Sequence, residues 1–127
     1  MKTSAIVPLL AVGFAALVNA EGCFSSKSQA WASQDPVAAN IEKYCTDGEL
    51  SGAFAAKQKK TRCEKDGDNS YVLSVTNTAS NNDDNLSAAD CKTGLTKFLI
   101  FCKNGGAGTL RDDLKFEFRA DPNKGGC

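Results

Sequence analysis

The sequence has 127 residues, with 15 basic and 15 acidic side chains, a net charge of zero at pH 7 and no histidine. This balance gives no basic surface of the kind that nucleic acids and anionic membranes attract, so neither is expected as a partner. The lack of histidine excludes Ser-His-Asp and Cys-His catalysis and removes the commonest metal ligand.

The first twenty residues predict a secretory signal peptide. Lys2 precedes an uncharged, mostly apolar run from Ala5 to Val18, and small residues follow at the cleavage positions of Val18-Asn19-Ala20. The alternative, an anchor retained in the membrane, is disfavoured because the run is short for a bilayer. We therefore expect residues 1–20 to be removed and a secreted domain to comprise residues 21–127, with no membrane span.

The first half of the domain predicts an extended piece over residues 23–31 and then a helix over 34–45. Asp35 is the expected N-cap and Pro36 the first helical residue, since both residue types are typical of these positions. Asp47-Gly48 is expected to end the helix. Helical spacing places four side chains on one buried face: Val37, Ile41, Tyr44 and Cys45.

A hairpin is predicted next, with strands over residues 57–65 and 70–78 joined by a turn at 66–69. Alternation places Tyr71, Leu73 and Val75 on one face of the second strand, and Tyr71 is expected to be half exposed. The run KQKKTR at 57–62 is interpreted as the solvated face of an edge strand, where lysines discourage aggregation. A protease-processing site or a contact to anionic glycans is the alternative.

A second helix is predicted over residues 87–102, with Ser87 and Asp90 as a capping box. Asn104-Gly105-Gly106 ends it. Its expected apolar face comprises Ala88, Cys91, Leu95, Phe98, Leu99 and Cys102, and Phe101 is also expected on a core face. In a last strand over 113–120, alternation turns Leu114, Phe116 and Phe118 toward the core.

The cysteines predict how this small domain is held together. An even number of cysteines in a secreted domain indicates three disulfides, whose pairing the sequence does not choose. No CxxC pair is present, so neither a metal site nor a cofactor is expected. Cys127, at the last position, is expected to tie down the end of the chain. The six disulfide residues are Cys23, Cys45, Cys63, Cys91, Cys102 and Cys127.

These elements predict an α+β fold. The order strand, helix, strand, strand, helix, strand buries every apolar face if both helices pack on one sheet. We therefore expect a single-domain, disulfide-stapled α/β sandwich, with a mostly antiparallel sheet flanked by two helices.

Few residues outside the core carry chemistry. Asn85-Leu86-Ser87 is an N-glycosylation sequon in a polar loop, so Asn85 is a candidate modification site. The pairs Asp83-Asp84 and Asp112-Asp113 offer carboxylates for a hydrolase, but adjacent residues rarely face each other across a substrate. Trp31 lies outside any apolar pattern and is the best candidate for stacking on a sugar ring, with packing into the core as its alternative role.

The order of motifs resembles a known family. GCFSS is followed by Trp31, a helix to Cys45, the strand YVLSVTN, a helix to Cys102 and the ending FRADPNKGGC. This pattern resembles the fungal secreted proteins described as glycan-binding protein Y3-like, over nearly the whole chain after the leader. The ending, Arg119-Ala120-Asp121-Pro122-Asn123 with Gly126-Cys127, is its most specific part.

The resemblance implies a fungal, secreted, lectin-like protein, not an enzyme, that recognises an N-acetylated sugar on glycans or glycoproteins. It also implies a homodimer through a sheet edge. Within the family-like ending, Arg119, Asp121 and Asn123 are predicted to donate or accept hydrogen bonds to the sugar. Their structural alternatives are an Arg119–carboxylate pair and a turn at Asp121-Pro122. A looser likeness to killer-toxin-like fungal proteins leaves a toxin or effector, acting on a competing or host cell, as the alternative function.

Overall fold

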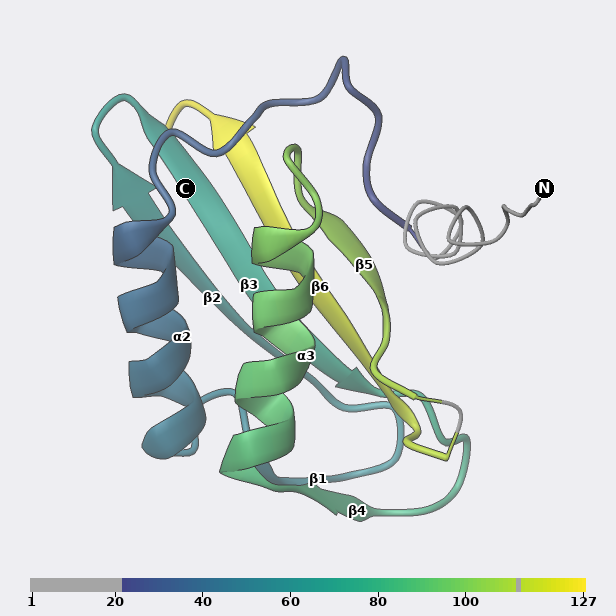
Figure 1. Cartoon of the computed structure of the whole chain (residues 1–127). Coiled ribbons are helices and arrows are strands. Elements are labelled where there is room, and N and C mark those ends of the chain that lie inside the picture. The colour runs from purple at the N-terminus through teal and green to yellow at the C-terminus, as the bar shows by residue number, and fades with distance from the viewer. Residues whose placement is uncertain (1–21, 112) are drawn as a thin grey trace, which may run out of the picture.

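The computed structural model describes residues 22–111 and 113–127. The predicted signal peptide over residues 1–20 lies outside the described residues. Two helices, α2 (Asp35–Thr46) and α3 (Ala88–Ile100), lie side by side on one face of a four-stranded antiparallel sheet (Figure 1). The predicted α+β sandwich with two flanking helices is therefore confirmed. Within the described residues, no helix is long and apolar enough to cross a membrane.

The main sheet has the strand order β2-β3-β6-β5, with every pair antiparallel. Its strands are β2 (Lys59–Asp66), β3 (Asn69–Asn77), β5 (Gly106–Thr109) and β6 (Phe116–Lys124). The predicted hairpin is β2–β3, with Gly67 in the left-handed region at φ 64°. β2 is an edge strand, as predicted. The whole run does not form a solvated face, however, because Lys60 lies 4.4 Å from the centre of the Phe54 ring and Arg62 lies 4.6 Å from that of Tyr44.

A second, two-stranded sheet at the end of the molecule was not predicted. Strands β1 (Gly52–Phe54) and β4 (Asp84–Leu86) pair antiparallel below the helices in Figure 1. Each strand has three residues, too few for an alternating pattern to be visible in the sequence. Phe54 and Leu86, at their ends, are buried in the core.

The apolar faces meet in one core between the helices and the sheet. Val37, Ile41, Tyr44 and Cys45 of α2 are all buried, as their spacing predicted. The prediction that Tyr71 is half exposed is wrong, since 2% of it is exposed beneath α2. Leu114 is only partly buried because it precedes β6.

The beginning of α2 differs from the prediction. Asp35 lies inside the helix, and Gln34 is the N-cap without a side-chain capping bond. The Gln34 amide instead donates to the Leu99 carbonyl at 3.1 Å, a contact between helices that local sequence does not reveal. Ser87 caps α3 as predicted, since its hydroxyl accepts the Asp90 N–H at 3.0 Å. The Asp90 carboxylate, the other half of the predicted capping box, instead accepts from Arg111 at 3.3 Å.

The segment 23–31, predicted to be extended, is irregular. Within this segment, the one β-type pairing is an isolated bridge between Cys23 and Gly106. Backbone hydrogen bonds from Phe24 to the Gly105 carbonyl (2.8 Å) and from Trp31 to the Lys103 carbonyl (3.3 Å) fix it to the loop after α3. A tertiary attachment, rather than strand propensity, therefore determines its path.

Strand β6 continues through Asp121-Pro122, where the sequence had suggested a turn. Proline lacks an N–H and is rare in central strands. Strand β5 pairs with β6 only as far as Ala120, so β6 has a free edge at Pro122 on that side. A Cβ built on Gly105 would lie 2.4 Å from Pro122 Cδ, so the chain passes this edge closely.

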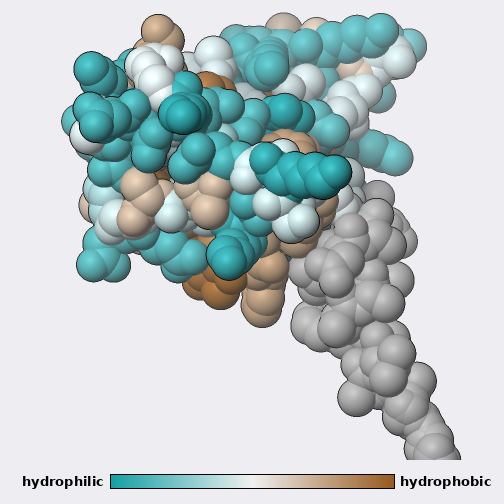
Figure 2. Space-filling model, turned by 90° about the horizontal axis from the view of Figure 1, so that it is seen from above, coloured by the Kyte–Doolittle hydropathy of each residue, from teal (hydrophilic) through white to brown (hydrophobic). Residues whose placement is uncertain are grey.

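Phe101, predicted to be in the core, is exposed. Helix α3 ends at Ile100, so the helical spacing that would have turned Phe101 inward stops one residue earlier. Ile100 and Phe101 are 57% and 56% exposed. The surface seen from above is mostly hydrophilic, with hydrophobic atoms gathered at one edge (Figure 2).

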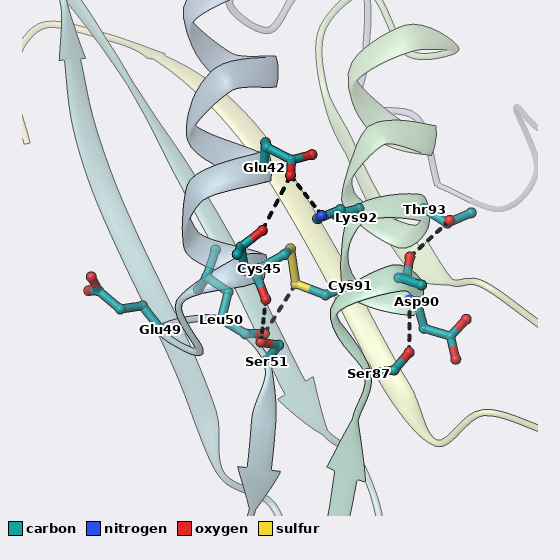
Figure 3. Close-up of a disulfide and its surroundings, with 12 residues drawn as sticks. Glu42, Cys45, Glu49, Leu50, Ser51, Ser87, Asp90, Cys91, Lys92 and Thr93 are labelled. Carbon is teal, nitrogen blue, oxygen red and sulfur yellow. Dashed lines mark hydrogen bonds and ion pairs between the residues drawn. A yellow bond between two sulfur atoms is a disulfide. The ribbon is translucent and has the colours of Figure 1, made fainter.

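Three disulfides join Cys23 to Cys102, Cys45 to Cys91 and Cys63 to Cys127, which confirms the predicted number. The Cys45–Cys91 bond links α2 to α3 in the core, and the Glu42–Lys92 ion pair (2.8 Å) lies above it (Figure 3).

Candidate functional site

The sheet has two chemically different faces, because successive side chains on a strand point in opposite directions. In β6, Phe116, Phe118 and Ala120 are buried toward the helices. Arg119, Asp121 and Asn123 alternate with them and lie on the opposite side, which we call the open face. The structure therefore brings three of the four predicted ligand contacts together in one row.

Arg119 is held by two neighbours. Its guanidinium carbon lies 4.7 Å from the centre of the Phe24 ring, and its Nη2 donates to Asp121 Oδ2 at 3.2 Å. The two charged side chains are 42% and 22% exposed, so the ion pair adds at most about 1 kcal/mol of stability. Its main effect is to orient a guanidinium that keeps further N–H groups for a ligand.

Asn123 is oriented through Asp121. Its amide donates to the backbone carbonyl of Asp121 at 3.1 Å. A side-chain amide carries two N–H donors and one carbonyl acceptor, so one donor and the acceptor remain. A carboxylate, an amide and a guanidinium therefore stand on alternate residues of one rigid strand.

The neighbouring strand adds a row of small side chains. Strand pairing sets Ser70 opposite Asn123, Val72 opposite Asp121 and Ser74 opposite Arg119, with side chains roughly 5 Å apart. Ser70 and Ser74 are 3% and 2% exposed. Across residues 22–111 and 113–127, neither serine hydroxyl has a hydrogen-bond partner, so both keep their hydrogen-bonding capacity.

Trp31 lies on the other side of the sheet. Its indole N–H donates to the Cys102 carbonyl at 2.9 Å, and its ring packs edge-on against Tyr71, 6.2 Å between centres. Tyr71 faces the helices, so the sheet separates Trp31 from the Arg119 row. These contacts favour the alternative role of packing, and Trp31 as a sugar contact stays a prediction.

Phe24 was not among the predicted contacts. It belongs to the irregular segment after Cys23, and its ring reaches Arg119 because the disulfide to Cys102 fixes its neighbour. The only signal in the sequence was an aromatic residue directly after a cysteine. No periodicity relates the two residues, which are far apart in the chain.

Asn85 and the acidic pairs are separate from this site. Asn85 is exposed on β4, opposite the exposed Ala53, while Leu86 is buried and Ser87 caps α3. Asp83 accepts the Ala56 N–H at 3.2 Å, and Asp84 accepts the N–H of Asn85 at 2.7 Å. Asp84 is therefore engaged locally, whereas Asp83 joins two segments that are far apart in the chain.

The remaining acidic pair is also engaged locally. Asp113 pairs with Arg111 at 2.8 Å. Asp112, its neighbour, lies outside the described residues.

Two buried tyrosines have perturbed pKa values. The hydrogen bond from Tyr44 to Glu64, together with burial, raises the pKa of Tyr44. Burial raises the pKa of Tyr71, whose hydroxyl accepts from Asn40 at 2.6 Å. Both hydroxyls lie on the helix side, so they belong to the scaffold rather than to the open face.

The model of the family described as "Glycan binding domain Y3" matches residues 37–127. The matched range includes α2 except its first two residues, α3, the whole main sheet and the Arg119–Asn123 row, whereas Phe24 and Trp31 precede it. No curated protein matches the chain.

Proposed function

The chain belongs to the Glycan binding domain Y3 family and is carbohydrate-binding, and we propose that it is a secreted, non-catalytic fungal lectin for N-acetylated glycans. One observation supports placing the glycan site on the open face. Arg119, Asp121 and Asn123 project from one strand inside the family-matched range, beside two serine hydroxyls without partners. Their oxygens are not fully enclosed, since Arg62 Nε is the one buried side-chain atom without a partner in the described part of the chain, so a ligand rich in hydrogen-bonding groups suits them.

The open face suits an acetamido group. Val72 is a partly exposed apolar residue directly opposite Asp121, so a methyl group can rest on it while the carboxylate accepts the amide N–H. Ser74 and Asn123, which flank this pair, supply hydrogen bonds to the acetamido carbonyl or to ring hydroxyls. A sugar with a free hydroxyl in place of the acetamido group loses both contacts.

Rigidity and multivalency complete the proposal. Three disulfides cross-link the fold before binding, which lowers the ordering cost of binding. A shallow face gives weak monovalent affinity, with Kd on the order of 1 mM. A homodimer through a sheet edge raises avidity toward clustered glycans. Disulfides of this number are typical of proteins secreted into an oxidising environment.

A glycan array with matched N-acetylated and non-acetylated sugars tests this function. We expect binding to the N-acetylated members, and loss of binding in Asp121→Asn and Asn123→Ala. Asn81→Ala is a matched control, because it removes the same side chain from an exposed loop. No binding by the intact protein at high density contradicts a lectin. Growth inhibition of cells stripped of glycans would favour the toxin instead.

A further inference from the structure

After β6 the chain turns back over the open face. Gly125, in the left-handed region at φ 86°, donates its N–H to the Asp68 carbonyl at 3.1 Å. Cys127 is then bonded to Cys63 of β2. The Cys63 side chain is on the open face, because its paired residue is Val72. Residues 125–127 therefore pass from one strand of the sheet to another on this face.

The path runs across β3. Strands β6 and β2 flank β3, so about 10 Å separates them, which is the reach of three extended residues. Ser70 lies on β3 where the segment crosses it, because its paired residues are Lys65 of β2 and Asn123 of β6. Its side chain points away from the helices, yet the residue is almost fully buried. The segment 125–127 covers this end of the open face.

The Cys63–Cys127 disulfide differs from the other two in its surroundings. Cys45 and Cys91 are fully buried, and Cys102 is 1% exposed, so those two bonds reach the core. Cys127 is exposed and Cys63 is partly exposed, and neither belongs to the core cluster. This bond therefore joins surface segments and adds nothing to the packing between helices and sheet.

We propose that residues 125–127, held by the Cys63–Cys127 disulfide, form one wall of the glycan site and that this disulfide is a positioning element for binding. The inference rests on the proposed function. The wall stands beside Asn123 and Val72, where the acetamido group is placed. The wall limits the sugar to one orientation along the row of Arg119, Asp121 and Asn123. Without residues 125–127, the open face would be flat and nothing would stop the sugar at the Asn123 end.

The first test follows backbone amide signals by NMR while N,N′-diacetylchitobiose is added to the full secreted protein. We expect the amides of Gly125 and Gly126 to shift together with that of Asp121. Shifts at Asp121 that leave both glycines unmoved overturn the wall. A protein that binds no array glycan overturns the proposed function itself, so the two failures are distinguishable.

The second test uses the double variant Cys63→Ser/Cys127→Ser, which leaves no free thiol. We expect it to stay folded, with Kd for the same chitobiose raised at least tenfold. Ile41→Val is the control for lost stability, because it trims the buried α2 face and leaves the open face intact, so its Kd is expected to be unchanged. A folded double variant with wild-type Kd overturns the proposal.

If the double variant does not fold, the variant Gly126→Leu tests the wall while the disulfide stays intact. A Cβ on Gly126 meets no atom within 4 Å, so the fold accepts the side chain. We expect an altered Kd at unchanged melting temperature. An unchanged Kd overturns the wall.

Discussion

Gly94→Ala should destabilise the protein although it improves the helix. Gly94 lies within α3 and faces β6, and a Cβ there would be 2.6 Å from three ring carbons of Phe118. Carbon atoms in contact normally lie about 3.5–4.0 Å apart. The ring must therefore move by roughly 1 Å in a fully buried site.

The two opposing effects can be estimated. Replacing glycine by alanine in a helix stabilises it by up to about 1 kcal/mol. Overpacking a core typically costs about 1–3 kcal/mol. We expect a net loss of about 1 kcal/mol, which lowers Tm by roughly 4–8 °C in a domain of this size.

Thermal unfolding followed by circular dichroism measures this change. Thr93→Ala is the control, because it improves helix propensity one residue away on an exposed position, and its Tm should stay equal or rise. Phe118→Leu should cost less in the Gly94→Ala background than in the wild type, since both act on one contact. A Gly94→Ala protein as stable as the wild type would refute the reasoning.

Three further predictions concern pH, binding and modification. The raised pKa values of Tyr44 and Tyr71 give stability that is fully present below their ordinary pKa of about 10 and is lost as pH rises through the folded values. The denaturant midpoint should therefore be lower at pH 11 than at pH 8, with the fall beginning near about pH 10, and this fall should be smaller in Tyr44→Phe; an equal fall in both proteins contradicts this cause. Phe24→Ala removes a partly exposed cation–π contact worth about 0.5–1 kcal/mol, so Kd for an N-acetylated glycan should rise about two- to fivefold, as measured by titration. An unchanged Kd would show that Phe24 does not orient Arg119 for binding. Protein secreted by a eukaryotic host should lose mass on endoglycosidase treatment through a glycan on Asn85, which is exposed on β4, whereas Asn85→Gln should not; equal mass loss in both refutes this site.

Helices longer than two turns and strands longer than five residues could be predicted from the sequence. The buried face of α2 and the alternation along β3 and β6 follow from periodicity alone, because a core on one side imposes it. The prediction was wrong where the pattern ends. Phe101 follows Phe98 at helical spacing, and the prediction placed the end of the helix after Cys102. The helix ends at Ile100, so this spacing no longer determines where Phe101 points.

Within the candidate site, the sequence supplied residue types and spacing. Arg119, Asp121 and Asn123 are two residues apart, so any strand through them places all three on one face. The sequence did not show that Trp31 lies beyond the sheet, because the segment containing it has no periodic pattern. Its position depends on hydrogen bonds to the loop after α3.

The sequence by itself determined the two helices, the hairpin, the inward faces and the number of disulfides, because each depends on local spacing or on a count. Only the tertiary structure decided the pairing of the cysteines, the place of Phe24 over Arg119 and the return of residues 125–127 across the sheet. These features join residues far apart in the chain, and such contacts form only when the helices and strands have packed around a common core.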